Sequence, residues 1–296
     1  MRSLLAIALL LASQSAAPPK QSAGPTMAPT QKVTLPNKPG TLKFAVIGDS
    51  GQPGGGQTAI AAQMVKWRAN FPFEFVIMTG DNLYGTERPR DYEQKFSIPY
   101  KAIIDAGVKF YASLGNHDDE GQTNYKLFNM EGRKYYSFKP KAEVRFFAID
   151  SNYVDTKQLE WLDKDLAASG SEWKIAFFHH PLYSSGATHG SADAQRGLLE
   201  PMFLKHGVNV VIAGHEHFYE RLKPQKGIAY FIVGSSAKLR KGDLRKSAMT
   251  AYGNDSDYAF MLVEIDGDNL NFQTISDKGV TLDSGVVTRP KATVSK

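Results

Sequence analysis

Residues 44–51 read Phe-Ala-Val-Ile-Gly-Asp-Ser-Gly, an apolar run of strand length that ends on a glycine and a carboxylate. Residues 75–81 repeat this order as Phe-Val-Ile-Met-Thr-Gly-Asp. Other apolar runs of strand length, rich in β-branched or aromatic residues, lie at 109–114, 144–149, 173–178 and 208–213. Segments with helical periodicity separate several of them, at 57–69, 90–106, 157–168 and 192–206. This alternation predicts an α/β fold whose sheet is largely parallel at its centre.

After Gly227 the pattern changes to shorter runs of alternating polarity. These runs span 228–233, 258–265 and 269–276, and Asp266-Gly267-Asp268 between the last two indicates a hairpin. We expect them to form a second sheet of mainly antiparallel strands, with helices covering the outer faces of both sheets. The predicted fold is therefore a four-layer α-β-β-α sandwich of two mixed sheets.

The N-terminal residues differ in composition from the rest of the chain. Arg2 precedes an apolar run at 4–12, and small residues follow it, which is the order of a secretory signal peptide. A membrane-spanning helix needs about 20 apolar residues, and this run is roughly half that length. We expect a signal peptide at 1–17, a proline-rich flexible linker at 18–40 and one catalytic domain at 41–296. The mature protein should be secreted, to the periplasm or the extracellular space, without membrane attachment.

The composition of the chain limits which metal ligands and which binding partners are possible. The chain has no cysteine, which excludes disulfides and thiolate metal sites and leaves oxygen and imidazole as metal ligands. The formal net charge of +5 favours anionic ligands. This charge is spread along the chain with no dense Lys/Arg run, so we expect small phosphorylated substrates rather than nucleic acid as partners.

Residues of metal-ligand type follow five of the predicted strands. An Asp after a Gly at a strand end is, taken singly, more often a turn former or helix N-cap than a ligand. Two such aspartates together with three further blocks of ligand-type residues reverse that interpretation, because the carboxyl ends of strands in α/β sheets meet at one edge and collect ligands there. We therefore predict a two-metal site at this edge, built by Asp49, Asp81, Tyr84, Asn116, His179, His215 and His217.

Two other motif interpretations fail on the residues. A zincin needs His-Glu-x-x-His, and Tyr219 occupies the position where the second histidine would stand after His215. The glycine-rich segment 51–56 lacks the Gly-Lys-Ser/Thr of a nucleotide-binding P-loop, so we interpret it as a flexible connection between strand and helix.

The five ordered blocks resemble the purple acid phosphatase branch of the calcineurin-like metallophosphoesterases, in particular its small tartrate-resistant type, over about residues 43–290. Tyr84 and Gly51 carry the likeness to this branch, because many relatives have a histidine ligand in place of Gly51. The resemblance implies one ion, Fe(III), bound by Asp49, Asp81, Tyr84 and His217. It implies a second ion, Fe(II), Zn(II) or Mn(II), bound by Asp81 as the bridge and by Asn116, His179 and His215.

The resemblance also implies roles for residues near the ligands. His117 should contact the transferring phosphoryl group, Asp118 should orient its ring, and His189 should be a second histidine that contacts the substrate. His180 occupies a variable position, and we place it beside the site rather than in it. The basic segment 235–252 has two open interpretations, attraction of phosphorylated substrates or a solvated charged loop.

The implied function is that of an exported acid phosphatase. It would hydrolyse phosphate monoesters by two-metal in-line attack of a metal-bound hydroxide. A phosphodiesterase or nucleotidase using the same site is the first alternative. A non-catalytic module that binds phosphate and metal without turnover is the second.

Overall fold

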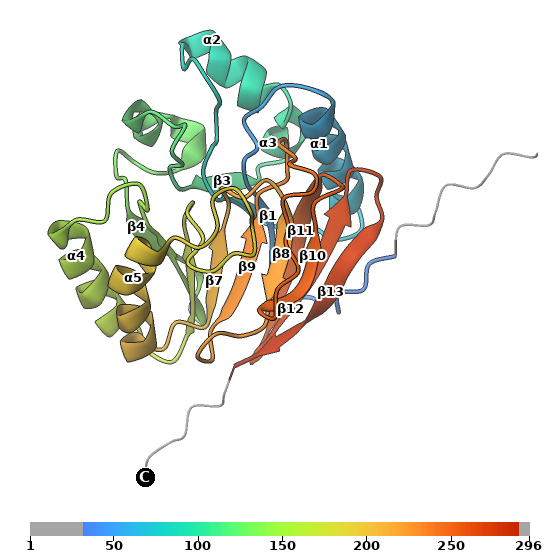
Figure 1. Cartoon of the computed structure of the whole chain (residues 1–296). Coiled ribbons are helices and arrows are strands. Elements are labelled where there is room, and N and C mark those ends of the chain that lie inside the picture. Colours follow the sequence, from blue (N-terminus) through green and yellow to red (C-terminus); the bar gives the residue numbers. More distant parts are fainter. Residues whose placement is uncertain (1–31, 290–296) are drawn as a thin grey trace, which may run out of the picture. The chain divides into compact units, whose positions relative to one another are not determined.

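The computed structural model describes residues 32–289, and within them two mixed sheets pack face to face (Figure 1). The first is six-stranded, with order β13-β12-β11-β1-β2-β3. Its strands β1, β2 and β3 are parallel, and β11, β12 and β13 add to β1 in antiparallel pairs. The bounds are β1 Leu42–Ile47, β2 Phe75–Met78, β3 Lys109–Ala112, β11 Ala259–Asp266, β12 Asn269–Ser276 and β13 Thr281–Thr288.

The second sheet is seven-stranded, with order β10-β8-β9-β7-β6-β5-β4. Strands β5, β6, β7 and β9 form its parallel centre, and antiparallel pairs add β4 at one side and β8 and β10 at the other. The bounds are β4 Tyr136–Lys141, β5 Val144–Ala148, β6 Trp173–Phe177, β7 Val210–Ala213, β8 Tyr219–Leu222, β9 Ala229–Val233 and β10 Thr250–Asn254.

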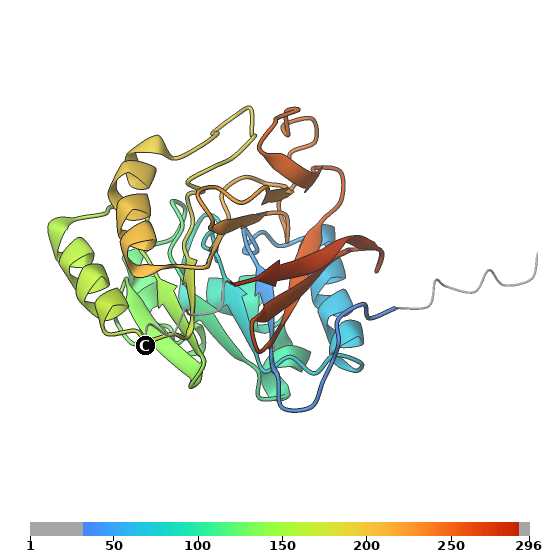
Figure 2. The same cartoon turned by 90° about the horizontal axis from the view of Figure 1, so that it is seen from below.

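Helices cover the outer faces of the two sheets, as the view in Figure 2 shows. Leu162 of α4 and Phe203 of α5 pack in one apolar cluster with Phe147 and Phe178 of the second sheet. Helix α1 buries Met64 in the other cluster, which also fills the space between the sheets. The helical bounds are α1 Gly55–Arg68, α2 Pro89–Tyr92, η1 Glu93–Ser97, α3 Lys101–Asp105, η2 Glu120–Asn124, η3 Lys126–Phe128, α4 Thr156–Ala167 and α5 Asp193–His206. The predicted four-layer sandwich is confirmed.

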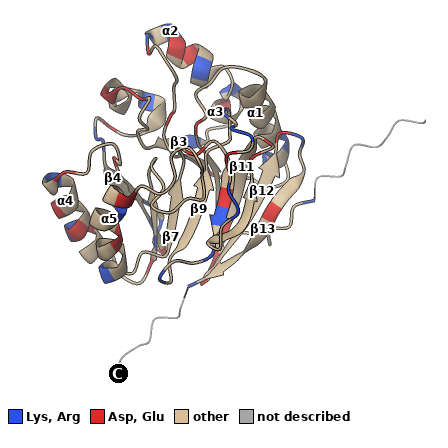
Figure 3. Cartoon of the chain, in the orientation of Figure 1, with Lys and Arg blue, Asp and Glu red and all other residues tan. Residues whose placement is uncertain are grey.

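Aromatic side chains join the two sheets. Phe44 of β1 and Phe75 of β2 stack with ring centroids 5.3 Å apart, and Phe146 of β5 meets both rings edge-on. All three rings lie in the buried apolar cluster, where each removes well over 100 Å² of surface from water. This packing fixes the distance between the two sets of strand ends that carry the predicted metal ligands. Charged residues, by contrast, are scattered over helices, loops and some strands (Figure 3).

The strands after Gly227 do not form a sheet of their own, and that prediction is wrong. Strands β11, β12 and β13 complete the first sheet, whereas β9 pairs in parallel with β7 in the second. Local polarity patterns indicate which segments are strands but contain no information on the distant edge that each strand joins. The predicted helix at 90–106 is also divided, into α2, a π-helical turn and α3.

The predicted flexible linker ends earlier than residue 40. Leu35 is 6% exposed, and the backbone N–H groups of Asn37 and Lys38 donate to the buried carboxylate of Glu264 at 2.5 and 2.7 Å. Segment 32–40 is therefore anchored to the domain at these points, where it satisfies a buried charge that would otherwise be costly, while most of its side chains are exposed. The predicted signal peptide at 1–17 lies outside the described residues. Within the described part, no helix is long and apolar enough to cross a membrane.

Candidate metal centre

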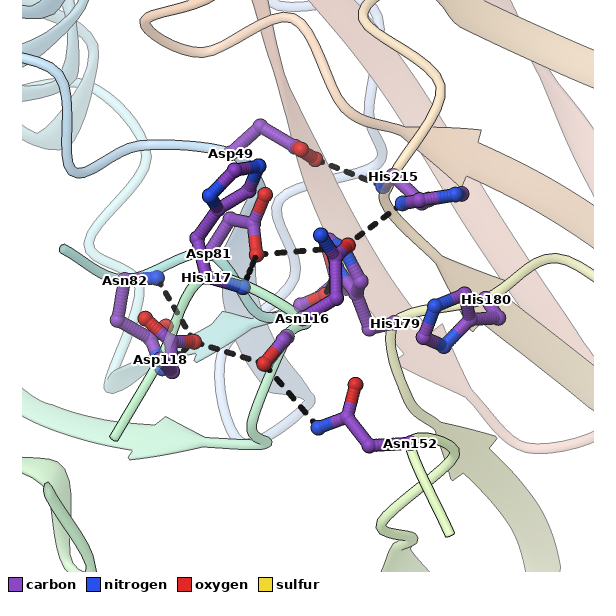
Figure 4. A network of polar contacts seen from close by, with 12 residues as sticks. Asp49, Asp81, Asn82, Asn116, His117, Asp118, Asn152, His179, His180 and His215 are labelled. Carbon is purple, nitrogen blue, oxygen red and sulfur yellow. Dashed lines mark hydrogen bonds and ion pairs between the residues drawn. The ribbon is translucent and has the colours of Figure 1, made fainter. Parts of the chain in front are cut away.

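The predicted ligands converge at the carboxyl ends of strands from both sheets, and Figure 4 shows Asp49, Asp81, Asn116, His179 and His215 among them. Loops after β1, β2 and β3 of the first sheet carry Asp49, Asp81 with Tyr84, and Asn116. Loops after β6 and β7 of the second sheet carry His179, and His215 with His217. Every oxygen donor of the set thus comes from one sheet, and every imidazole comes from the other.

Three of these residues have left-handed backbone conformations. The φ angles are 51° at Asp49, 51° at Asp81 and 69° at His215, a region that side chains other than glycine rarely adopt. Such strain is typical of residues that the surrounding structure holds in place for function. Close packing of the loops explains a neighbouring glycine, because a Cβ on Gly115 would lie 2.2 Å from Oδ1 of Asp81.

One group of donor atoms surrounds the Tyr84 hydroxyl. This hydroxyl is 3.0 Å from Oδ1 of Asp49 and 3.2 Å from Nε2 of His217. Nε2 of His217 is 3.4 Å from Oδ1 of Asp49. Donor atoms of Asp49, Asp81 and His217 all lie within 4.8 Å of one another. Two carboxylates, a phenol and an imidazole thus face one point.

A second group surrounds Nε2 of His179. This nitrogen is 3.0 Å from Oδ1 of Asn116, 3.3 Å from Oδ1 of Asp81 and 3.1 Å from Nδ1 of His215. Ligand atoms bound to one ion at about 2.0–2.2 Å are separated by roughly 3.0–3.5 Å, so the spacing fits a shared cation. Asp81 belongs to both groups, which is the position of a bridging ligand.

The imidazoles are in the form that binds metals. Nδ1 of His179 lies 3.0 Å from the carbonyl oxygen of Thr79, which can only accept, so Nδ1 carries the proton and Nε2 presents its lone pair to the site. Burial lowers the pKa of His179 well below its usual value. Burial also lowers the pKa of His215 to about 2 and that of His217 to about 4, which keeps both rings neutral.

The carboxylates are poorly compensated by the protein alone. Burial, and then the charge of Asp81, raise the pKa of Asp49 well above its usual value. Burial, and then the charges of Asp49 and Asp81, raise the pKa of Tyr84. Two buried carboxylates at this distance repel each other strongly in a medium of low polarity. Cations at this position remove that cost, so the donor set fits the metal pair that the sequence predicts.

The predicted catalytic histidines both lie at the site. The ring centroid of His117 is 4.9 Å from that of Tyr84, and the ring of His189 is 4.2 Å from that of His215. His180 points its Nδ1 to the Ser151 hydroxyl at 2.9 Å, so it lies beside the donor groups as expected.

Asp118 is bound mainly to backbone. Its carboxylate accepts from the N–H groups of Asn82 at 3.1 Å, Leu83 at 3.0 Å and Gly115 at 2.8 Å. These bonds join the loop that carries Asp81 to the loop that carries Asn116. Among the described residues no hydrogen bond links Asp118 to the His117 ring, so the predicted orienting role stays a prediction.

The sequence did not predict a role for Glu216, nor the contact that Lys238 makes at the site. Glu216 is fully buried and accepts from the N–H of Gly190 at 2.7 Å, which ties the loop of His189 to the loop of the two histidine ligands. For Glu216, the available sequence signal was its position between the predicted ligands His215 and His217. Nζ of Lys238 lies 4.5 Å from the centroid of the Tyr84 ring, a position that no local pattern indicates.

Comparison with known proteins places these observations in a family context. The model of the calcineurin-like phosphoesterase family matches residues 42–219. Purple acid phosphatase 17 of Arabidopsis thaliana is 28% identical over 242 residues, which cover 69% of this chain and 71% of that protein. Tartrate-resistant acid phosphatase type 5 of Rattus norvegicus is 24% identical over 295 residues, 82% of this chain and 89% of that protein.

Solved structures share the fold at lower identity. The yellow lupin (Lupinus luteus) purple acid phosphatase PPD1 has a TM-score of 0.73 at 18% identity, covering 87% of this chain and 55% of that one. GAP50, described as the anchor in the inner membrane complex of Plasmodium, has a TM-score of 0.72 at 21% identity, covering 85% of this chain and 90% of that one.

Proposed function

The chain belongs to the calcineurin-like phosphoesterase family, and from this we propose that it is an exported acid phosphatase that hydrolyses phosphate monoesters at a two-metal centre. The observation that carries the proposal is the pair of donor groups that share Asp81, one of which contains Tyr84. The curated relatives with this chemistry in their names are purple acid phosphatases and tartrate-resistant acid phosphatases.

The two donor groups favour different ions. Asp49, Asp81, Tyr84 and His217 supply mainly anionic oxygen, which suits a hard trivalent ion such as Fe(III). Asp81, Asn116, His179 and His215 include two imidazoles, which suit Fe(II), Zn(II) or Mn(II). When bound, such a pair lowers the pKa of water and neutralises charge on phosphate oxygens.

The residues around the two groups would orient the substrate and move protons. His117, exposed beside Tyr84, is placed to donate a proton to the leaving oxygen. His189, beside His215, is placed to donate a hydrogen bond to a phosphoryl oxygen. Asp118 would keep the loops of Asp81 and Asn116 at a constant separation through its backbone bonds.

We expect the metal-loaded protein to hydrolyse phosphate monoesters faster than diesters, with an optimum below neutral pH. The physical reason is that a histidine beside the leaving oxygen must be protonated to donate to it. Parallel kinetics on 4-nitrophenyl phosphate and bis(4-nitrophenyl) phosphate measure the preference. Faster diester hydrolysis would establish the phosphodiesterase alternative, and phosphate binding without turnover would establish the binding module.

Export is part of the same proposal. If residues 1–17 are a signal peptide, protein recovered outside the cytoplasm begins near residue 18. The N-terminal residue of that protein, read by mass spectrometry, tests the assignment.

A further inference from the structure

A cavity of about 500 Å³ opens beside the second donor group. The predicted ligand Asn116 and its neighbour His180 are among its lining residues, so it adjoins the candidate metal centre. Its other walls come from the loop after β5, the start of α5 and the loop before β4, which provide Asp150, Asn152, Gln195 and Lys134. In Figure 4 the side chain of Asn152 extends toward the space between Asn116 and His180.

Two amide side chains of this cavity have orientations that are set by hydrogen bonds donated from their nitrogens. Nδ2 of Asn152 donates to the carbonyl oxygen of Gly115 at 3.1 Å, and Nε2 of Gln195 donates to that of Ser151 at 3.2 Å. Within the described part of the chain, neither amide oxygen accepts a hydrogen bond. Both oxygens are therefore available as acceptors for a bound group.

Three carboxyl groups and one ammonium group line the cavity. Asp150 is 4% exposed, and one of its oxygens accepts from the N–H of Asn152 at 3.0 Å. The ammonium of Lys134 pairs with Glu120 at 2.8 Å, which leaves Asp150 and Asp118 as further acidic lining residues. The two amide oxygens can only accept, so they would bind hydroxyl and ammonium donors and oppose a second anionic group on a substrate.

Building on the proposed function, we propose that this cavity binds the alcohol part of the substrate and selects alcohols rich in hydrogen-bond donors without a second negative charge. Sugar phosphates and amino-alcohol phosphates share this chemistry. Tyr153, 73% exposed at the cavity, offers a ring face for a sugar C–H surface or an ammonium group.

The test compares kcat/KM for glucose 6-phosphate, phosphoethanolamine and 3-phosphoglycerate, with 4-nitrophenyl phosphate as the reference. We expect the first two to exceed 3-phosphoglycerate, and their ratio shows whether hydroxyl or ammonium donors are preferred. In Gln195→Met, kcat/KM for the preferred substrate should fall about 3- to 10-fold relative to the reference, the range for one neutral hydrogen bond. Gln195→Glu, which keeps the acceptor, should lose less for a donor-rich alcohol.

Gln225→Met is the matched control, because Gln225 also donates to a backbone carbonyl but lies in the turn between β8 and β9. Equal or faster hydrolysis of 3-phosphoglycerate, or an equal loss on every ester in Gln195→Met, overturns the assignment of the cavity. Absence of turnover on the reference ester rejects the proposed phosphatase itself, so the two failures are distinct.

A different observation concerns the surroundings of Tyr84. Lys238, half-buried in the loop after β9, lies with Nζ 4.5 Å from the centroid of the Tyr84 ring. The neighbouring guanidinium of Arg240 is 3.9 Å from Glu216 and 3.6 Å from Asp243, so its charge is compensated locally. Lys241, Arg245 and Lys246 are exposed. In segment 235–252, the Lys238 ammonium thus contacts the ring of a candidate ligand, whereas the Arg240 guanidinium is held by two carboxylates.

From this position we infer that Lys238 is a specificity-determining residue that favours the dianion of a phosphate monoester over the monoanion of a diester. The inference also depends on the proposed function. An ammonium beside the metal ligands adds attraction for each negative charge on the phosphate group, and above its second pKa of about 6 the monoester has one more such charge than the diester. The basic segment then has two parts, Lys238 at the site and a solvated remainder.

The experiment measures kcat/KM of Lys238→Met, Lys238→Arg and Lys241→Met on the paired mono- and diester substrates, together with inhibition by inorganic phosphate and metal content. In Lys238→Met we expect the monoester to lose about 10-fold more than the diester, the range for one charge-assisted hydrogen bond. Phosphate inhibition should weaken in parallel. Lys238→Arg should keep most of the preference, and Lys241→Met should retain all of it. An unchanged ratio at equal metal content overturns the inference, whereas wild-type inactivity rejects the phosphatase proposal instead.

Discussion

Asp81→Asn is expected to abolish phosphatase activity and, at the same time, to raise the thermal stability of the metal-free chain. Oδ1 of Asp81 is 3.3 Å from Nε2 of His179, and the carboxylate also belongs to the group around Asp49 and His217. A neutral amide cannot bridge two cations, so both should bind weakly. The loss should exceed the roughly 10- to 100-fold that removal of an outer hydrogen-bond partner costs a metal site.

The stability gain has a separate cause. Asp49 and Asp81 are both buried, and after burial itself the charge of Asp81 is the largest cause that raises the pKa of Asp49. Asparagine removes this repulsion but keeps an oxygen that accepts from the N–H of His117, now at 3.0 Å from Oδ1 of Asp81. For a chain of this size, each 1 kcal/mol gained raises Tm by roughly 2–4 °C.

Thermal unfolding of chelated wild type and variant measures the effect, and metal content and turnover are measured on the reloaded proteins. Asp165→Asn is the control, because Asp165 pairs with Arg145 at 2.5 Å away from the site and its replacement should lower Tm. A lower Tm in both variants would show that the two site carboxylates do not destabilise the metal-free fold.

Tyr84→Phe is expected to remove the visible colour of the iron-loaded protein. The hydroxyl lies among the donor atoms, 3.0 Å from Oδ1 of Asp49 and 3.2 Å from Nε2 of His217. Burial and the two carboxylates raise the pKa of Tyr84, so the protein alone favours a neutral phenol. Only a strongly polarising cation can make it a phenolate, and phenolate bound to Fe(III) absorbs visible light through charge transfer.

Absorption spectra at equal iron content measure this prediction. Tyr230→Phe is the matched control, because Tyr230 is buried in β9 and packs with the cluster beneath α4 and α5 rather than at the site. The control should keep the band. An identical band in wild type and Tyr84→Phe would reject the tyrosinate assignment and leave a two-metal phosphoesterase without this ligand.

Much of the fold could be predicted because the central strands are buried on both faces. The predicted strands 75–78 and 269–276 coincide with β2 and β12, where apolar or alternating residues end at turn residues. Edge strands bury less surface and have weaker patterns. Strand β4 contains Pro140, which a central strand would not tolerate, and β13 has several exposed polar residues. Neither strand was predicted, and neither was the edge strand β10. Strand β8, which lies inside the second sheet but is only four residues long, was not predicted either.

The residues of the candidate site also fall into those that the sequence could predict and those that it could not. Asp49, Asp81 and His215 could be predicted because each follows a glycine at the end of an apolar run, so the strand itself brings it to the common edge. The contacts of Asp118 and Lys238 could not be predicted from the sequence. Asp118 reaches backbone of two different loops, and Lys238 meets the Tyr84 ring through a loop whose path depends on distant partners.

Because the oxygen donors come from one sheet and the imidazoles from the other, the identity of the bound metal should affect how firmly the two sheets are held together. Mg²⁺ and Ca²⁺, which take oxygen ligands, would engage the loops of the first sheet and leave the imidazoles free. Iron or zinc would bind across the sandwich and fasten its two halves together. In a chain without cysteine, such ions act as the cross-link that a disulfide supplies elsewhere. Separation of the halves, and with it the rate of unfolding, would then be limited by metal release.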